Sequence, residues 1–261
     1  MSGSPPAEAV DAHVEVQHRS SGGVAVVSFS RGPHNFLSYG FLERMSAAIE
    51  SAAEQGARAA VLRTPSRHFC AGADFRGPPS GAAGPSIFDI VPRLLSWPVP
   101  VVAAVGGAAV GGGFGLALAA DFRVVAAPAY FLANFTRLGI TPGFGMTVTL
   151  PSLIGSQRAA ELLYSSRRVE AEEAIGVGLA DRCVDGSELD EQAEAFAAEI
   201  ALGAPSAIAA VRAHLRSGLV EGLAEALERE RSTQERLMAT EDFREGVQAW
   251  RDRRDPEFAG H

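Results

Sequence analysis

The chain contains no lysine: all 23 of its basic residues are arginines, against 31 acidic residues, and the formal net charge is −8. Schiff-base and pyridoxal-phosphate enzymes and P-loop nucleotide sites all depend on a lysine, so these classes are excluded. The negative charge also argues against a nucleic-acid partner, because an acidic surface repels phosphates.

Metal-binding patterns are also missing. The two cysteines, Cys70 and Cys183, form no CxxC pair, and the six histidines contain no HxxxH pair. We therefore expect no metal site and a reducing, cytoplasmic location. Residues 1–12 lack the basic start and apolar run of a secretory signal, which predicts a frayed tail. At 47% hydrophobic and 21% charged residues, the chain can bury a large core.

One segment, residues 99–120, is long enough to span a membrane: it has 22 residues and no charge. Its GxxxG spacings resemble a packing motif of transmembrane helices. However, the segment contains six glycines, each of which costs about 1 kcal/mol in a helix. Pro98 and Pro100 stand at its start, and no basic flank follows it. We therefore predict a strand, a glycine turn and a short buried helix, with no membrane partner.

Strands and helices alternate along the first 200 residues, which predicts an α/β fold. The expected strands are residues 13–18, 24–29, 59–63, 99–105, 122–126 and 129–132. The expected helices are residues 39–55 and 87–96 and a helix after Gly112, with an exposed glycine- and proline-rich loop at residues 77–85.

The character of the sequence changes near residue 200. Residues 188–202, 207–217, 222–238 and 241–251 are each predicted as helices rich in Arg and Glu. We therefore divide the chain into a core, residues 1–200, and a C-terminal helical region, residues 201–261.

Two glycine-containing turns are candidates for a site. One is F-C-A-G-A-D at residues 69–74, and the other is the glycine-rich stretch at residues 106–113, between a strand and a helix. Small residues let a ligand approach the backbone, and two converging N–H groups would form an oxyanion hole. Taken singly, either turn is explained as well by close packing. A dinucleotide site is poorly supported, because residues 111–116 fail the last position of GxGxxG.

Together the turns resemble the enoyl-CoA hydratase/isomerase (crotonase) superfamily, and the resemblance covers nearly the whole chain. The stretches that carry it are F-C-A-G-A-D at 69–74, P-V-P-V-V-A-A-V-G-G-A-A-V-G-G-G at 98–113, Asp121, F-x-x-x-F-x-R-L-G-I-x-P-G at 131–143, A-x-x-x-G-L-A-D at 174–181 and T-E-D-F-R-E-G at 240–246.

The resemblance implies a spiral of ββα units whose C-terminal helices build a homotrimer or a dimer of trimers. It also implies an acyl-CoA ligand, with coenzyme A present as the thioester substrate and no permanently bound cofactor. Ala73 and Gly112 would supply the backbone N–H groups that stabilise a thioester enolate. The CoA contacts would fall on Pro33, His34, Arg67, Ala71 and Ala73.

The departures from the family pattern concern its chemistry. The two glutamates with which hydratases of this family activate water would stand at positions 115 and 135, where this chain has Gly115 and Phe135. A dehalogenase-type aspartate would stand at Gly143. Without a carboxylate, water activation has no general base, so we expect no standard hydration.

The remaining candidates are an apolar wall and a few polar side chains. The acyl pocket is expected to contain Phe88, Phe114, Phe135, Leu138 and Phe144. Asp74 and Asp89 are possible acids or bases, although Asp74 could instead cap the next turn and the sequence does not fix the orientation of the helix that carries Asp89. Two hypotheses stay open: a lyase or isomerase that uses enolate chemistry such as decarboxylation, and a protein that binds acyl-CoA without turnover.

Overall fold

The structure is a computed structural model that describes residues 12–19, 23–75 and 85–261. The tail predicted at residues 1–12 and the loop predicted at residues 77–85 therefore lie almost wholly outside the described residues.

Most of the predicted strands meet in one six-stranded sheet with the order β1-β2-β3-β4-β6-β9. β1 is antiparallel to β2, and the other neighbours are parallel. The strands are β1 (His13–His18), β2 (Val24–Ser30), β3 (Ala59–Arg63), β4 (Val101–Val105), β6 (Phe122–Ala126) and β9 (Arg182–Val184).

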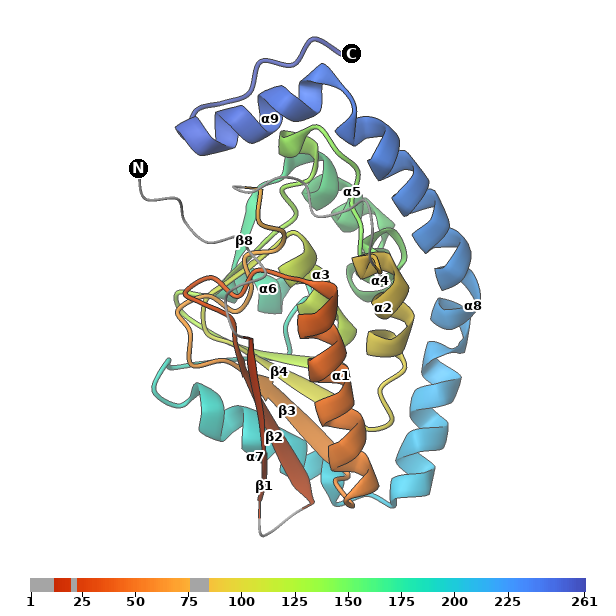
Figure 1. Ribbon diagram of the computed structural model, residues 1–261. Coiled ribbons are helices and arrows are strands. Elements are labelled where there is room, and N and C mark those ends of the chain that lie inside the picture. Colours follow the sequence, from red (N-terminus) through yellow and green to blue (C-terminus); the bar gives the residue numbers. More distant parts are fainter. Residues whose placement is uncertain (1–11, 20–22, 76–84) are drawn as a thin grey trace.

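Two apolar cores lie on opposite faces of this sheet, because alternate side chains of a strand point to opposite faces. On one face Val26, Val61 and Val102 pack against α7 (Leu189–Ala201). On the other face Leu62 and Ala103 belong to the larger core, which contains α1 (Tyr39–Glu54) and α2 (Ile87–Leu95). In Figure 1, α1 and α7 lie on either side of the strands.

A second, three-stranded sheet was not predicted. It consists of β5 (Ala108–Val110), β7 (Tyr130–Leu132) and β8 (Arg168–Glu170). β5 lies in the stretch predicted as a glycine turn. It was missed because its residues are small and it is only three residues long. β4, β5 and α3 (Gly112–Ala119) form a strand–strand–helix unit, and this arrangement carries the glycine-rich turn into the first turn of α3.

Short elements connect the small sheet to the C-terminal region. They are the 3₁₀ turn η2 (Thr136–Leu138), α4 (Met146–Ile154), α5 (Ser156–Ser165) and α6 (Ala171–Gly176).

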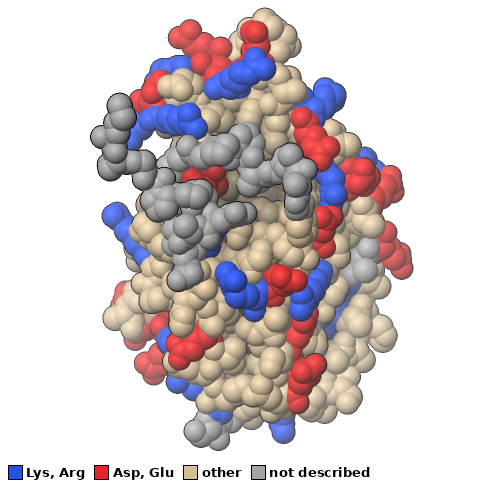
Figure 2. All heavy atoms as spheres, viewed as in Figure 1, with Lys and Arg blue, Asp and Glu red and all other residues tan. Residues whose placement is uncertain are grey.

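The C-terminal region differs from the prediction in one element. Residues 207–217 and 222–238 were predicted as separate helices, but they form one helix, α8 (Pro205–Met238). A Cβ at Gly218 or Gly222 would meet nothing within 4 Å, so neither glycine serves a turn or a close contact. Figure 1 shows α8 running along the whole side of the molecule, with α9 (Glu241–Asp252) folded across its end. Figure 2 shows acidic and basic side chains interspersed along this edge.

Within the described residues, no single helix is long and apolar enough to cross a membrane. One pair of helices in the described part of the chain, α7 and the start of α8, is long and apolar enough when taken together, but the two are bent by 102° relative to each other. The uncharged segment 99–120 divides into β4, β5 and α3, as predicted apart from β5.

Candidate active site

Backbone hydrogen bonds hold the F-C-A-G-A-D turn against β5. Cys70 N donates to Ala108 O (3.0 Å), and Val110 N donates to Cys70 O (2.9 Å). Leu37 N donates to Gly72 O (2.9 Å), so the turn is fixed from two sides. The two turns predicted from the sequence are therefore neighbours in space.

Glycines allow the two turns to approach this closely. A Cβ on Gly113 would lie 2.1 Å from Cys70 O, so any larger residue would collide with the first turn. A Cβ on Gly72 would lie 2.6 Å from Val110 O and 3.4 Å from Gly112 N. Gly72 has a φ of +78°, in the region that favours glycine.

The two proposed amide donors lie at this contact. Gly112 is the first residue of α3, and its cap residue Gly111 makes no side-chain hydrogen bond to the helix. Ala73 is exposed and follows Gly72 directly. Within the described part of the chain, neither amide N–H donates to an acceptor. A helix N-terminus with unpaired N–H groups favours negative charge, so an anionic oxygen is the ligand that fits here.

Cys70 lies beside these donors but is fully buried. Burial raises the pKa of its thiol to about 12, so the thiol stays protonated at neutral pH. Its Sγ lies 3.0 Å from Asn35 O, to which it donates. Cys70 therefore acts as a small buried residue rather than a nucleophile, because the reactive form is the thiolate.

The predicted CoA side is built around Asn35, which belongs to the same turn as the predicted contacts Pro33 and His34. Asn35 is fully buried with a φ of +52°. Its Nδ2 donates to Thr64 Oγ1 (2.9 Å), His68 O (3.0 Å) and Phe69 O (3.1 Å). The side chain thereby ties the Pro33–His34 turn to the loop that contains Arg67. A G-P-H-N sequence is a recognisable turn signal, but only the structure shows what the amide bonds.

The turn and the loop bring two imidazole rings together. The rings of His34 and His68 are stacked with centroids 5.3 Å apart. Burial, followed by the charges of His34 and Arg67, lowers the pKa of His68. Pro33 and Arg67 are exposed beside them, and Ala71 N donates to His34 O (3.0 Å). The predicted CoA contacts therefore lie on two connected loops.

The two candidate carboxylates differ in their surroundings. Asp89 accepts a hydrogen bond from Ser86 N (2.8 Å) in a capping box at the start of α2, and it forms an ion pair with Arg231. Arg231 and the Ser86 amide lower the pKa of Asp89, which favours the ionised form over a proton donor. Asp74 follows Ala73 in the first turn and is partly buried. Their role as acid or base stays a prediction.

The apolar residues predicted for the acyl pocket lie on different segments of the chain. Phe135, Leu138 and Phe144 are buried and lie on the segment between β7 and α4. Phe88 is partly buried, and its ring lies 5.6 Å from the Arg231 guanidinium. Phe114 lies on α3 and packs against Phe131, with ring centroids 5.1 Å apart, and it belongs to the same main core as Phe135, Leu138 and Phe144.

Phe144 has an unusual backbone conformation, with a φ of +67°. A non-glycine residue in this region costs about 1–2 kcal/mol. The next residue, Gly145, also has a positive φ of +69°. Glu230 on α8 holds this loop: its carboxylate accepts hydrogen bonds from Gly145 N (2.8 Å) and Thr147 N (2.9 Å). Burial raises the pKa of Glu230, although the hydrogen bonds from Thr147 and Gly145 oppose this shift.

The C-terminal helix α9 packs against the same end of the molecule. A Cβ on Gly246 would lie 2.6 Å from the backbone of Leu138. The ring of Phe243 lies 6.1 Å from that of Phe75, directly after the F-C-A-G-A-D turn. The C-terminal region thus contributes to the surroundings of the site in its own chain. Whether it also joins subunits stays a prediction.

A cavity of about 530 Å³ lies behind the 136–142 segment and is lined partly by Ile140, Thr141 and Pro142. Its lining includes neither Ala73 nor Gly112. The Thr141 hydroxyl is buried without a hydrogen-bond partner among the described residues. The cavity is therefore separate from the contact between the two turns, where an anionic oxygen would bind.

Comparisons with known proteins agree with this geometry. Residues 19–261 match the family model described as enoyl-CoA hydratase/isomerase. A probable enoyl-CoA hydratase of Rhodobacter capsulatus is 36% identical, over 94% of this chain and 98% of its own length.

Two solved structures show the same architecture. An enoyl-CoA hydratase/isomerase from Pseudoalteromonas atlantica has a TM-score of 0.85 at 25% identity, covering 94% of this chain and 99% of its own. A methylmalonyl-CoA decarboxylase in complex with 2-nitronate-propionyl-CoA has a TM-score of 0.80 at 28% identity, covering 95% and 98%. The fold is thus the crotonase-type α/β fold predicted from the sequence, and the chain belongs to the enoyl-CoA hydratase/isomerase (crotonase) superfamily.

Proposed function

We propose that this acyl-CoA-processing enzyme stabilises a thioester enolate with Ala73 N–H and Gly112 N–H and does not carry out two-glutamate hydration. The observation that carries the proposal is the contact between the two turns, at which neither amide donates to an acceptor among the described residues. Preorganised donors of this kind supply several kcal/mol when negative charge develops on a carbonyl oxygen.

Decarboxylation of a 2-carboxyacyl-CoA is the reaction that these residues support best. The bond between the α-carbon and the carboxylate breaks, and its electron pair forms the enolate, whose oxygen accepts hydrogen bonds from Ala73 and Gly112. Carbon dioxide leaves, and the α-carbon then takes a proton from water. No general base is needed, which suits a site with Gly115 and Phe135 at the positions of the hydratase glutamates. The likeness to the decarboxylase structure is further support.

The polar loops around Arg67 and His34 are the proposed site for the CoA part of the substrate. An arginine can bind phosphate through paired N–H groups, so the absence of lysine is no obstacle to this role. Exposed apolar side chains on α8, Val211 (56% exposed) and Leu215 (81% exposed), favour the proposed assembly into a homotrimer or a dimer of trimers.

The test is product analysis with purified protein and three thioesters: crotonyl-CoA, malonyl-CoA and methylmalonyl-CoA. We expect carbon dioxide from a malonyl-type substrate, one deuterium at the α-carbon of the product in D₂O, and no 3-hydroxyacyl-CoA from crotonyl-CoA. Hydration of crotonyl-CoA at rates ordinary for the family would contradict the proposal. Tight binding of all three thioesters without any product would favour the second candidate, an acyl-CoA-binding protein, which the same missing carboxylates support.

A further inference from the structure

The side-chain space of residue 115 is occupied by another residue. A Cβ built on Gly115 would lie 2.6 Å from Cβ and Cγ of Phe144 and 2.7 Å from its Cδ1. Real Cβ atoms do not approach other carbons this closely, and the nearest atom, a Cβ, belongs to the fixed base of the side chain. Gly115 and Phe144 are therefore a complementary pair, and α3 can carry no larger residue at 115 while Phe144 keeps its place.

The same phenyl ring extends to the proposed oxyanion donor. Residues 112 and 115 are three positions apart and share one face of α3. Phe144 Cδ2 lies 3.7 Å from a Cβ built on Gly112, and Leu37 Cδ1 lies 2.7 Å from that same point. The ring of Phe135 reaches within 3.9 Å of a Cβ built on Gly111. Three apolar side chains thus lie around the first turn of α3, together with Asn134, whose Oδ1 lies 3.1 Å from a Cβ built on Gly111.

The loop that carries Phe144 is constrained from several directions. Phe144 has a positive φ and is only 4% exposed, and it lies between Gly143 and Gly145. A Cβ on Gly143 would lie 3.1 Å from the Phe88 ring, so this backbone has little room to move. Glu230 fixes the other side through Gly145 N and Thr147 N. Unfavourable backbone conformations held in this way concentrate at functional sites.

We infer that Phe144 is a specificity-determining residue of the acyl site. Its ring takes the place of the side chain that α3 would otherwise carry at 115, limits the size of the acyl group next to Gly112, and excludes water from that face. The inference rests on the proposed function, since it requires an acyl thioester bound at Gly112. A carboxylate placed against this ring loses its hydration, whereas carbon dioxide is neutral, so the ring favours loss of carbon dioxide.

The selectivity test compares the wild type with Phe144→Gly, which removes the ring and suits the positive φ. Dissociation constants of acetyl-, butyryl- and hexanoyl-CoA are measured by titration calorimetry. We expect the variant to shift its preference toward longer chains by about fourfold for each methylene that enters the freed space. Phe196→Ala, which removes a phenyl ring from α7 on the other face of the sheet, is the matched control and leaves the preference unchanged.

A second measurement tests, without requiring activity, whether the Phe144 ring occupies the side-chain space of residue 115. We expect Gly115→Ala alone to lower the melting temperature strongly, and Gly115→Ala combined with Phe144→Gly to lower it by less than the sum of the single changes. Strictly additive effects, or an unchanged chain-length preference in Phe144→Gly, would overturn the inference. The two proposals fail separately: a wild type that binds no acyl-CoA contradicts the proposed function, whereas an unchanged preference in a protein that binds and decarboxylates contradicts only the role of Phe144.

Discussion

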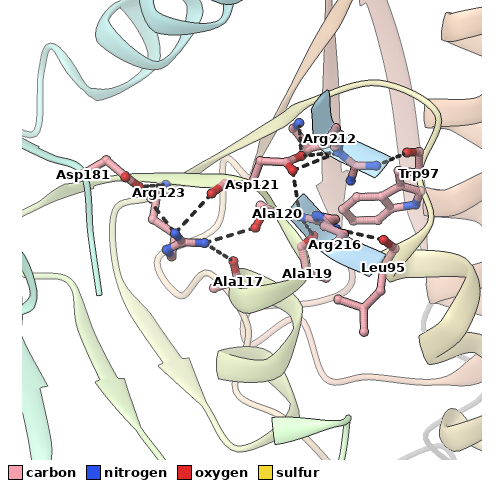
Figure 3. Close-up of polar contacts among 11 residues, drawn as sticks. Leu95, Trp97, Ala117, Ala119, Ala120, Asp121, Arg123, Asp181, Arg212 and Arg216 are labelled. Atoms are coloured by element: carbon pink, nitrogen blue, oxygen red, sulfur yellow. Dashed lines mark hydrogen bonds and ion pairs between the residues drawn. The ribbon is translucent and has the colours of Figure 1, made fainter. Parts of the chain in front are cut away.

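The two ends of α3 differ in the side chains that contact their backbone groups. At its N-terminus the cap residue is Gly111, with no side-chain hydrogen bond to the helix, and the nearby side chains are apolar apart from Asn134. At its C-terminus charged side chains bond the last carbonyl groups: Arg123 Nη1 donates to Ala120 O (3.1 Å), and Arg216 Nη2 donates to Ala119 O (3.3 Å). Figure 3 shows these arginines converging on the end of the helix from different segments.

One carboxylate holds the charged end together. Asp121 accepts hydrogen bonds from Arg212 Nε (2.8 Å), Arg216 Nη2 (2.8 Å) and Val101 N (2.9 Å). Burial lowers the pKa of Arg123 and of Arg216, and in both cases the charge of Asp121 opposes the shift. The positive charges lie where the helix dipole is negative, which stabilises them.

The difference shows how a helix can serve both the fold and a reaction. Its negative end is bonded by this chain's own arginines, whereas in the proposed function its positive end supplies N–H groups to an anion that forms only during turnover. α8 contributes side chains near both ends of α3. Arg212 and Arg216 lie at its C-terminus, and Glu230 bonds the loop near its N-terminus. Because the two ends of α3 are contacted by different residues, single substitutions can test each end separately.

The largest expected effect is a loss of stability in Asp121→Ala, which removes the carboxylate at the C-terminus of α3. Removing this carboxylate leaves two largely buried guanidinium groups without their partner, which costs about 3–5 kcal/mol of unfolding free energy. Urea denaturation measures the loss. Asp190→Ala breaks the ion pair of Arg63 with a half-exposed carboxylate and serves as the control, with about 0–1 kcal/mol. Equal losses in both variants would contradict the role assigned to Asp121.

The second effect concerns the N-terminus of α3 and is a loss of turnover. Gly112→Pro removes one oxyanion N–H, and proline is tolerated at the first position of a helix. We expect kcat on the best thioester to fall by about 10²–10³, with a much smaller change in the dissociation constant and in stability. Because the new ring must displace Leu37, Leu37→Ala is the matched control. A variant that retains full turnover would exclude Gly112 as an oxyanion donor.

The smallest effect is a pH dependence carried by Glu230. Because its pKa is raised in the folded protein above the ordinary 4.5, the folded state binds this proton more tightly than the unfolded state does. Its contribution to stability is therefore complete below pH 4.5 and declines as the pH rises through the folded pKa.

Glu230→Gln should remove this decline, so that the difference in unfolding free energy between variant and wild type changes in the variant's favour as the pH rises above the ordinary pKa of 4.5. Thermal unfolding across this range provides the measurement. Glu225→Gln, at an exposed position on the same helix, is the control. Parallel pH profiles of Glu230→Gln and the wild type would contradict the raised pKa.

Features with a local cause could be predicted from the sequence. β-branched runs identified most strands of the main sheet, and the glycine turns marked the two segments that meet at the site. β5 was missed because three small residues carry no strand signal of their own; its pairing with β7 and with Cys70 defines it. α8 was divided because glycine weakens a helix, but Leu223 and Leu227, buried in the main core, hold it as one helix.

The sequence by itself determined that no lysine is present anywhere in the chain, and its resemblance to the family predicts Gly115 and Phe135 where hydration needs carboxylates. Only the tertiary structure decided what occupies that space. Phe144 is 29 positions from Gly115 in the chain, yet it fills the volume beside it. Such a pairing depends on how a loop after β7 packs against α3, and long-range packing leaves no periodic or local signal in a sequence.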